Sequence, residues 1–415
     1  MKLINQPFTG QLGNTLIELL DSSDYHTLNI AVAFAKNSGV LRMKDSFENF
    51  RARGGNINVY VGVDLGVTSY EALTALLVCT DSLNVVHTEK GQTFHSKIYH
   101  FSGEKKELIV IGSNNLTGGG LWTNLESSAL ITLDPTNSFD SGALRDQKDY
   151  INKLNELHNS CMPIANKGDI DRLLDNGYVF KEVSQRIHLA TSAGQHKKKK
   201  HLFGKWILAH LPRLSSQHTD TNTPEIDKPI SSDGDAQNHT SINSNSTWDT
   251  IWFETRKLTG GSRNILDLSM KSLLVNGTPI GTCFDLGESK FMKGAVVFFD
   301  IDAIDYGTKK DITLNFEGVD YIGNTILYPS GKNANGTWRL QIKGVSLLGG
   351  KITDAFREKG ENYYLVEKII TFTKIKDDYF AISVFPESEV SHFEETSRIL
   401  ARNGSTRTAK RLGLF

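Results

Sequence analysis

Two short and almost uninterrupted apolar runs, residues 28–35 and 57–63, constrain the fold more than any other feature of this sequence. Runs of this length without polar alternation are typical of strands that are buried on both faces of a sheet. Between them, residues 39–50 carry apolar side chains at helical spacing, and a Gly-Gly pair follows, as is common after a helix. Strands that alternate with helices predict a layered α/β domain.

The same alternation continues along the first half of the chain. Helices are predicted at residues 14–20, 70–78 and 140–158, and strands at residues 83–86 and at three apolar runs between residues 94 and 133. A chain of 415 residues is long enough for two domains. We therefore expect a first domain, residues 1–190, with a mixed sheet flanked by helices.

The runs between residues 94 and 133 carry a group of polar side chains. His95 and Lys97 stand two apart in an alternating segment, so they project from the same face of a strand. Ser113 and Asn115 follow the end of the next apolar run, where short polar side chains and backbone N–H groups suit an anion. Glu126 opens the third run. A nucleophile or acid, a fixed cation and amide donors make a phosphoryl-transfer site that needs no metal.

The order His-x-Lys followed by Gly-Ser-x-Asn resembles the signature of the phospholipase D superfamily in residue type and spacing. The aspartate that most members carry a few residues after the lysine is absent, and Ser102 stands about where it would fall. A signature without this aspartate but with a downstream glutamate resembles one branch, the metal-independent restriction endonucleases of the BfiI, NgoFVII and NgoAVII type. This resemblance implies a phospholipase D-like nuclease domain with no metal and no other cofactor.

The resemblance also implies a role for each polar residue of this stretch. His95 would attack phosphorus and form a phosphohistidine intermediate. Lys97 and Asn115 would hold the non-bridging oxygens, where negative charge has to be stabilised. Ser113 would add a hydroxyl donor. Glu126 would orient an imidazole and favour its protonated form, since a nearby carboxylate supports a charged histidine.

The number of motifs predicts the oligomeric state. Chemistry in this superfamily uses two histidines, one that attacks and one that protonates the leaving oxygen. The chain has one His-x-Lys motif and no second Gly-Ser-x-Asn paired with another. The missing histidine is therefore expected from a second copy, which predicts a two-fold homodimer of the nuclease domain with the site across its interface.

Other polar residues near this stretch have plainer interpretations. His87 and His100 are interpreted as ordinary strand residues, because no partner motif surrounds either of them. Gly118-Gly119-Gly120 fits a phosphate-binding nest and fits equally a flexible turn between strands.

Composition limits the other possibilities. The formal net charge is −1, so any nucleic-acid surface has to be local. The three cysteines are far apart in sequence and lack zinc-site spacing, which predicts free thiols in a reducing compartment. The N-terminus has no apolar core of a signal peptide, and no run approaches the roughly 20 apolar residues of a membrane span. We expect a cytoplasmic protein without a membrane contact.

Residues 191–246 have the composition of a linker. A run of four lysines, Lys197-Lys198-Lys199-Lys200, is followed by a brief apolar stretch and then by a segment rich in Ser, Thr, Asn and Asp. Such a segment predicts a flexible polar tether. The lysine run fits either contact with phosphates or a solvated run of charges.

The second half of the chain, residues 247–415, changes to short strands separated by glycine turns, which predicts a small all-β barrel. Strands are expected at residues 250–254, 264–268, 294–299, 311–316, 324–328, 338–342, 363–371 and 379–384. Helices are expected at residues 352–359 and 392–402. By its place after the nuclease domain, this half resembles the plant B-three type of pseudobarrel, shared with the effector domain of EcoRII, which implies a DNA-recognition domain with two loop arms.

Two polar loops of this half are the expected arms. Arginine, asparagine and glutamine make bidentate contacts with base edges, and lysine and serine suit phosphates, although surface turns have the same composition. The basic tail, residues 398–411, fits either backbone phosphate contacts or a frayed end. The candidate DNA-binding residues of the first arm are Arg256, Lys257, Ser262, Arg263 and Asn264, and those of the second are Lys332, Asn333, Asn335, Trp338, Arg339 and Gln341.

The sequence therefore predicts a sequence-specific DNA endonuclease that acts without a metal ion on double-stranded DNA. A phospholipase or non-specific nuclease with the same site is the alternative within the superfamily. A DNA-binding protein with an inactive site is the alternative outside enzymes. No P-loop motif is present, so any ATP dependence would come from a separate helicase subunit, as in relatives of this branch, and a cognate methyltransferase is the other expected partner.

Overall fold

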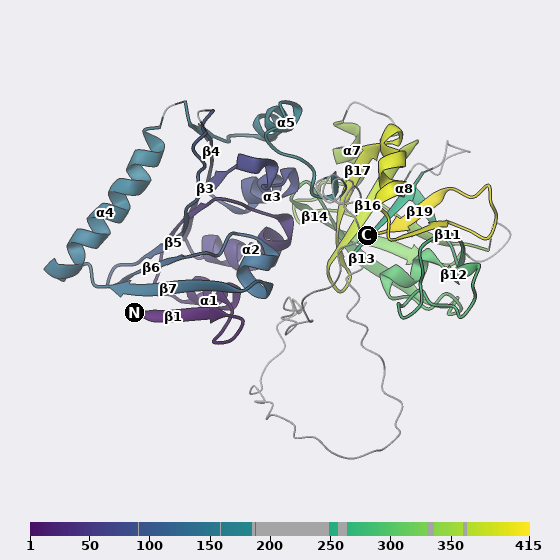
Figure 1. Ribbon diagram of the computed structural model, residues 1–415, viewed down its shortest axis with the longest axis horizontal. Coiled ribbons are helices and arrows are strands. Elements are labelled where there is room, and N and C mark those ends of the chain that lie inside the picture. Colours follow the sequence, from purple (N-terminus) through teal and green to yellow (C-terminus); the bar gives the residue numbers. More distant parts are fainter. Residues whose placement is uncertain are drawn as a thin grey trace, which may run out of the picture.

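The computed structural model describes residues 1–89, 91–157, 159–184, 187, 249–255, 264–329, 336–359 and 363–415. Within these ranges, two sheets organise the chain into an N-terminal part up to residue 187 and a C-terminal part from residue 249, called the N-terminal and C-terminal domains below (Figure 1). The predicted linker, residues 191–246, lies outside the described residues, as does the lysine run within it.

The N-terminal domain has an eight-stranded mixed sheet with the order β1-β7-β6-β5-β2-β3-β4-β8. Strands β2, β3 and β4 are parallel, and β5 joins them antiparallel to β2. The strands are β1 (Lys2–Gln6), β2 (Thr27–Val32), β3 (Asn56–Gly62), β4 (Ser82–Val86), β5 (Lys97–Ser102), β6 (Glu107–Gly112), β7 (Glu126–Leu133) and β8 (Cys161–Pro163).

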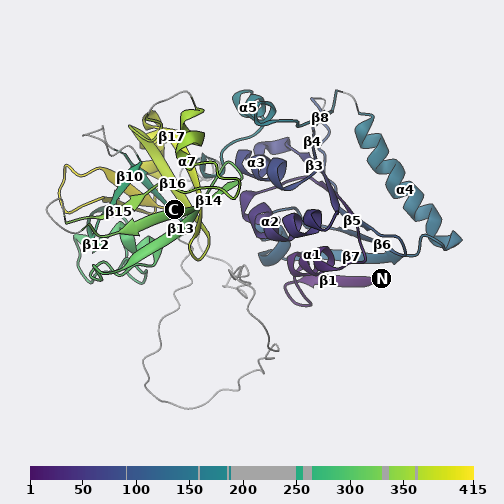
Figure 2. The same ribbon diagram turned by 180° about the vertical axis from the view of Figure 1, so that it is seen from behind.

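Helices cover both faces of this sheet. Helices α1 (Leu12–Asp21), α2 (Asn37–Ala52) and α3 (Tyr70–Cys79) lie on one face, and α4 (Ser138–Asn155) crosses the other (Figures 1 and 2). A shorter helix, α5 (Lys167–Asp175), follows β8, and short turns occur at η1 (Asp64–Gly66) and η2 (Gly119–Thr123). The predicted layered α/β arrangement is therefore observed, although β1, β8 and α5 were not predicted. In β1 only Ile4 and Gln6 are buried, so this edge strand has almost no apolar pattern.

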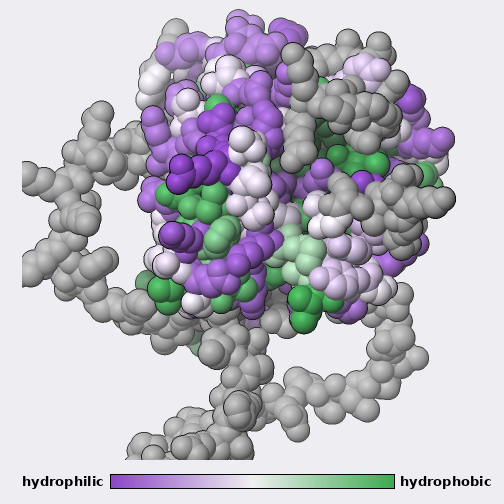
Figure 3. All heavy atoms as spheres, turned by 90° about the vertical axis from the view of Figure 1, so that its right-hand side faces the viewer, coloured by the Kyte–Doolittle hydropathy of each residue, from purple (hydrophilic) through white to green (hydrophobic). Residues whose placement is uncertain are grey.

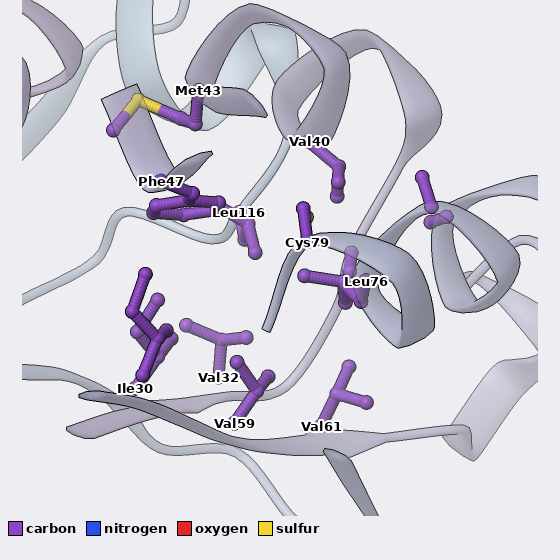
Figure 4. Packing of buried hydrophobic residues seen from close by; sticks show 14 of the residues in the cluster. Ile30, Val32, Val40, Met43, Phe47, Val59, Val61, Leu76, Cys79 and Leu116 are labelled. Atoms are coloured by element: carbon purple, nitrogen blue, oxygen red, sulfur yellow. The ribbon is translucent and has the colours of Figure 1, made fainter. Parts of the chain in front are cut away.

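Burial on both faces explains the uninterrupted apolar runs of β2 and β3. Alternate residues point to opposite faces of a strand. Ile30, Val32, Val59 and Val61 pack beneath α2 and α3, against side chains that include Phe47 (Figure 4). Ala31 and Tyr60, which alternate with these residues along β2 and β3, point to the opposite face. There they belong to a smaller cluster with Val86, Leu154 and Cys161.

The C-terminal domain is mainly β, with an eleven-stranded sheet that is antiparallel except where β13 pairs with β17. Its strands are β9 (Thr250–Glu254), β10 (Ile265–Leu268), β11 (Lys271–Asn276), β12 (Phe291–Lys293), β13 (Lys309–Phe316), β14 (Val319–Leu327), β15 (Trp338–Gln341), β16 (Lys368–Lys376), β17 (Tyr379–Pro386), β18 (Ile399–Arg402) and β19 (Arg411–Leu414). Two helices, α7 (Ile352–Arg357) and α8 (Val390–Thr396), accompany them. Its outer face is largely hydrophilic with separate apolar patches (Figure 3).

Three expectations for this domain were wrong. The apolar run at residues 294–299 is a 3-10 turn, η3 (Ala295–Phe299), and not a strand, because a short run of buried residues does not distinguish the two by periodicity. The strand predicted from residue 363 begins only at residue 368. The helix predicted at residues 392–402 ends at residue 396, and β18 follows it.

The basic tail is an integral part of the second sheet rather than a frayed end. Strand β19 pairs with β9 and with β18. Glu254 of β9 is 5% exposed and accepts hydrogen bonds from Lys410 at 2.7 Å and from Arg411 at 2.8 Å. Burial raises the pKa of Glu254, but these hydrogen bonds outweigh burial and lower it to about 2. The two cations at the end of the tail therefore neutralise a carboxylate of the fold.

The two domains meet through α2 and α3 of the first and through β14, β16 and β17 of the second. Lys44 on α2 is buried and pairs with Asp320 on β14. Ser383 on β17 donates a hydrogen bond of 2.8 Å to Glu71 on α3. Apolar residues of β16 and β17, Ile375 and Tyr379 among them, belong to the same core cluster as the N-terminal helices.

Among the described residues, no helix is both long and apolar enough to cross a membrane.

Candidate active site

The candidate site forms where β2 and β6 end and β5 begins. Phe34 follows β2, and its backbone N–H donates to Oδ1 of Asn115 at 3.2 Å. The ring of Phe34 also packs edge-on against the imidazole of His95, with 6.0 Å between ring centroids. Phe34 thus connects His95 with Asn115, which are separated by a whole strand pair in sequence.

His95 and Lys97 lie together, although β5 begins at Lys97 and His95 precedes it rather than sharing a strand face with it. Nζ of Lys97 is 2.9 Å from Nδ1 of His95 and 2.9 Å from the backbone oxygen of His95. His95 is exposed, whereas Lys97 is only 8% exposed. Burial lowers the pKa of Lys97, and the negative charge of Glu126 opposes this effect. A partly desolvated ammonium group is therefore held beside an accessible imidazole.

Glu126 is bound to Ser113 and Asn124. The hydroxyl of Ser113 donates to Oε2 of Glu126 and accepts from the backbone N–H of Ser127 at 3.1 Å. Nδ2 of Asn124 donates to Oε1 of Glu126 at 3.2 Å. Within the part of one chain that the structure describes, Glu126 forms no hydrogen bond with an imidazole. Its predicted action on a histidine therefore needs a rearrangement or an imidazole from a second copy.

The two asparagines of the Gly-Ser-Asn-Asn segment have different surroundings. Asn114 is buried, and its side chain donates to the oxygen of Gly120 at 2.6 Å and accepts from Ser128. Asn115 is half-buried, and its oxygen is held by Phe34. This contact leaves the Nδ2 group of Asn115 to donate to an anion. Asn114 thus supports the loop, and Asn115 is the residue suited to bind a phosphate oxygen.

The triple glycine after this loop lies in the connection between β6 and β7, where two of its N–H groups already have partners. Gly119 and Gly120 belong to the helical turn η2, and the N–H groups of Gly118 and Gly120 donate to the hydroxyls of Ser38 and Thr117 at 3.1 and 2.8 Å. A Cβ atom on Gly120 would lie 2.4 Å from the oxygen of Asn115. The glycines therefore allow the turn to pack closely on the loop that carries Asn115.

Ser102, at the position of the absent aspartate, lies at the far end of β5 from Lys97. Its hydroxyl is near His100 and Glu107, whose side chains are joined at 2.6 Å, and Lys148 of α4 binds Glu107 at 3.1 Å. Burial lowers the pKa of His100, although Glu107 opposes this. These residues form a network that attaches α4 to the sheet, in keeping with a structural role for His100.

The predicted DNA-binding residues are only partly within the described chain. Arg256, Lys257, Ser262, Arg263, Lys332, Asn333 and Asn335 lie outside it. Asn264, Arg339 and Gln341 are half-buried at the β10–β15 pair, where Nε of Arg339 is 3.8 Å from Asp267 and Gln341 accepts from Lys343 at 2.9 Å.

Trp338 has to be withdrawn from the candidate DNA-binding residues. It is fully buried in the C-terminal core, and its indole N–H donates to the oxygen of Ala303 at 3.1 Å. Alternation along β15 explains this, because residues 338 and 340 point into the core while residues 339 and 341 point outward. The same alternation is present in the sequence.

Sequence reasoning missed Asp64, which follows β3 and contacts the segment that carries His95. Only its place at the end of an apolar strand distinguishes it in the sequence.

Among the described residues, no group of three or more His, Cys, Asp or Glu side chains is arranged to hold a metal ion.

Comparisons with known proteins concern the structure only, because the sequence matches no family model and none of the curated proteins. NucT from Helicobacter pylori is similar over 39% of this chain and 98% of its own, with 18% identity and a TM-score of 0.30. Nuc from Salmonella typhimurium, a phospholipase D family member, is similar over 40% of this chain and 97% of its own, with 13% identity and a TM-score of 0.31. Phosphatidylserine synthase from Haemophilus influenzae is similar over 44% of this chain and 43% of its own, with 12% identity and a TM-score of 0.30.

Proposed function

We propose that this protein is a sequence-specific DNA endonuclease that hydrolyses phosphodiester bonds through a covalent intermediate on His95, without a metal ion. The observation that carries this proposal is the ammonium group of Lys97 at 2.9 Å from the imidazole of His95. The imidazole of His95 is accessible and lies beside a buried cation. Phe34 contacts both His95 and Asn115, so an amide donor is close by. These groups suit nucleophilic attack on a phosphodiester.

In the proposed reaction, a nitrogen of His95 attacks phosphorus and a P–N bond forms. The bond from phosphorus to the leaving oxygen breaks, and that oxygen takes a proton from a second imidazole. Water then gives its proton to the second imidazole and attacks phosphorus, which breaks the P–N bond and restores His95. Lys97 neutralises the non-bridging oxygens and Asn115 donates a hydrogen bond to them in both steps, and Ser113 and Glu126 hold the loop beside them.

The second imidazole is proposed to be His95 of a second copy, in a two-fold homodimer of the N-terminal domains. Two copies of one His-x-Lys motif supply the attacking and the protonating group. Mixing His95→Ala chains with wild-type chains tests this. Mixed dimers should be inactive if both imidazoles are needed, so excess variant should suppress wild-type activity. Activity that stays proportional to the wild-type chain would contradict the shared site.

DNA recognition is proposed for the C-terminal domain as a B-three-like pseudobarrel. Arg339, Gln341 and Asn264 present polar groups on one edge of its sheet, at half-buried positions. The residues of the first predicted arm precede β10 in the chain, and those of the second begin before β15 and continue into it. Double-stranded DNA bound there would be the substrate, and a helicase subunit and a methyltransferase are the proposed partners of such an enzyme in the cytoplasm.

Incubation of a sequenced plasmid with the full-length protein, in EDTA and then in magnesium, tests the proposed activity. Discrete fragments in EDTA would support it, and a strict magnesium requirement for the chemistry would contradict it. His95→Ala should abolish cleavage and leave DNA binding intact. A phosphorylated protein trapped by acid quenching should also disappear in this variant.

A non-specific phosphodiesterase is the second candidate function. The site itself supports it equally, because His95, Lys97 and Asn115 are arranged to contact a phosphodiester and not a base. Random degradation of the plasmid, or hydrolysis of a phospholipid at a rate comparable to that of DNA, would favour this candidate. Tight DNA binding without any turnover would favour an inactive DNA-binding protein.

A further inference from the structure

The carboxylate of Asp64 touches the chain directly beside the proposed nucleophile. Asp64 begins the turn η1 after β3 and is only 7% exposed. Its Oδ2 accepts a hydrogen bond of 2.9 Å from the backbone N–H of Phe94, the residue before His95. Its Oδ1 lies 2.8 Å from Nδ1 of His87. One carboxylate therefore connects the ends of β3 and β4 with the segment that carries His95.

The segment on the other side of His95 is held as well. The backbone oxygen of Ser96 accepts a hydrogen bond of 2.8 Å from the N–H of Ala33, at the end of β2. The hydroxyl of Ser96 also binds that of Tyr150 on α4. His95 thus stands between two backbone anchors, Asp64 at residue 94 and Ala33 at residue 96.

Packing leaves this segment little space to move. A Cβ atom on Gly62 would lie 2.7 Å from the oxygen of Ala33 and 3.2 Å from both the ring and the oxygen of Phe94. Glycine at this position allows β3 to approach the chain before His95 closely. The carboxylate of Asp64, two residues later, is thereby brought to the N–H of Phe94.

The turn that presents Asp64 is not explained by burial of apolar surface. Leu65, its central residue, has φ of 59° and is 83% exposed. A leucine in the left-handed region costs about 1–2 kcal/mol, and an exposed side chain gains little from packing. Such strain is typical of a turn that is maintained to place a particular group, here the carboxylate of Asp64.

His87 is the partner that makes a buried carboxylate tolerable at this place. Among the described residues, its imidazole is the only basic side chain within salt-bridge distance of Asp64. The ring of His87 is in turn fixed by an edge-on contact with Tyr178, at 5.2 Å between centroids, and its Nε2 lies 3.8 Å from Glu89. Nothing in the sequence indicated this contact between His87 and Asp64.

We infer that Asp64, supported by His87, is a positioning residue that fixes the backbone of Phe94 and thereby aims the imidazole of His95. This inference rests on the proposed phosphohistidine chemistry. Asp64 does not touch the substrate. It acts through the peptide between residues 93 and 94, whose N–H it binds, and a displacement of the nucleophile of about 1 Å is enough to lower the rate roughly 100-fold.

Substitutions of Asp64 in the full-length protein test this, with bis(4-nitrophenyl) phosphate as the substrate so that DNA recognition plays no part. Asp64→Leu should lower kcat roughly 100-fold and leave KM within about two-fold. Asp64→Asn should recover most of this loss, because its amide oxygen still accepts from Phe94 and its NH2 group donates to a neutral His87. An Asp64→Leu variant with wild-type kcat, or an Asp64→Asn variant no better than Asp64→Leu, would overturn the inference.

Asp81 provides the matched control at the opposite end of β3. Its Oδ2 accepts from the backbone N–H of Ile57 at 2.9 Å and its Oδ1 from Arg51 at 3.0 Å, so it makes the same kind of contacts far from His95. Asp81→Leu should lower the melting temperature without changing kcat. An equal loss of kcat in both leucine variants would reduce Asp64 to a stability residue and overturn the inference.

Two further measurements keep the outcome decisive. If Asp64→Leu does not fold, His87→Phe is the replacement, because it removes the imidazole partner and keeps a ring against Tyr178. A lower kcat of this variant at unchanged KM supports the inference, and an unchanged kcat overturns it. Amide exchange at residue 94 should accelerate in Asp64→Leu, which lacks the acceptor for this N–H, and not in Asp64→Asn or Asp81→Leu. Accelerated exchange in a protein whose wild type is inactive would contradict the proposed function and leave the contact itself established.

Discussion

The ammonium group of Lys97 lies 2.9 Å from Nδ1 of His95 and so occupies one of the two nitrogens of the proposed nucleophile. A protonated lysine has no acceptor, so Nδ1 accepts this hydrogen bond, and a neutral His95 carries its proton on Nε2. Attack by Nε2 requires that proton to move to Nδ1. We therefore expect the hydrogen bond between Lys97 and Nδ1 of His95 to break before His95 reacts. The ammonium group of Lys97 would then bind the phosphate of the substrate instead.

The charge state of Lys97 should set the alkaline limit of activity. Burial holds its pKa below the ordinary 10.5, and Glu126 opposes that effect. Activity should therefore fall as pH rises through a value below 10.5, where Lys97 loses its proton. Glu126→Gln should move this decline to lower pH, because the opposing negative charge is gone. Hydrolysis of bis(4-nitrophenyl) phosphate as a function of pH measures it.

The control for this experiment is Glu104→Gln, an exposed carboxylate in the turn between β5 and β6. It should leave the pH profile unchanged. A decline at the same pH in Glu126→Gln and in the wild type would show that another group limits the reaction.

Two neighbouring asparagines should give opposite results. Asn115→Ala removes a donor to the phosphate and should lower kcat roughly 100- to 1000-fold with little effect on unfolding. Asn114→Ala removes the buried bonds to Gly120 and Ser128 and should lower the free energy of unfolding by about 1–3 kcal/mol. Steady-state kinetics and urea unfolding of both variants separate the two effects. A stability loss in Asn115→Ala alone would reverse the assignment.

Glu254 should make the stability of the protein dependent on pH. Its pKa is about 2 in the folded protein against an ordinary value of 4.5, so its stabilising contribution is complete above pH 4.5 and is lost as pH falls toward 2. Glu254→Gln should destabilise the protein by roughly 2–3 kcal/mol at pH 7, and the difference from the wild type should shrink below pH 4.5. Urea unfolding at several pH values measures this, with the exposed Glu395→Gln as the control.

Adjacent residues of β15 should separate folding from DNA recognition. Trp338→Ala empties a buried position and should cost roughly 3–5 kcal/mol of stability. Arg339→Ala should leave stability nearly unchanged and, if the residue reads a base, weaken discrimination between sites by about 1–3 kcal/mol. Unfolding curves and competition binding with cognate and altered duplexes test the pair. If Arg339→Ala binds each duplex with the same affinity as the wild type does, Arg339 does not belong to the recognition surface.

Local patterns were sufficient for much of the N-terminal domain. The apolar runs of β2 and β3 are buried on both faces, so their composition alone identified them. Sequence patterns did not predict the secondary structure correctly where contacts with distant residues, rather than the local sequence, determine it. Strand β1, which has little apolar pattern of its own, pairs with β7, and the apolar residues of η3 are buried in a turn rather than in a strand.

The sequence by itself determined the layered α/β first domain, the mainly-β second one and the residue types of a phosphoryl-transfer site, because periodicity and short-range spacing are local properties. Only the tertiary structure decided that Phe34 joins the segment of His95 to Asn115, and that Asp64 and His87 support this segment. Those relationships join residues from different strands. They depend on how the strands are ordered in the sheet, which no local pattern specifies.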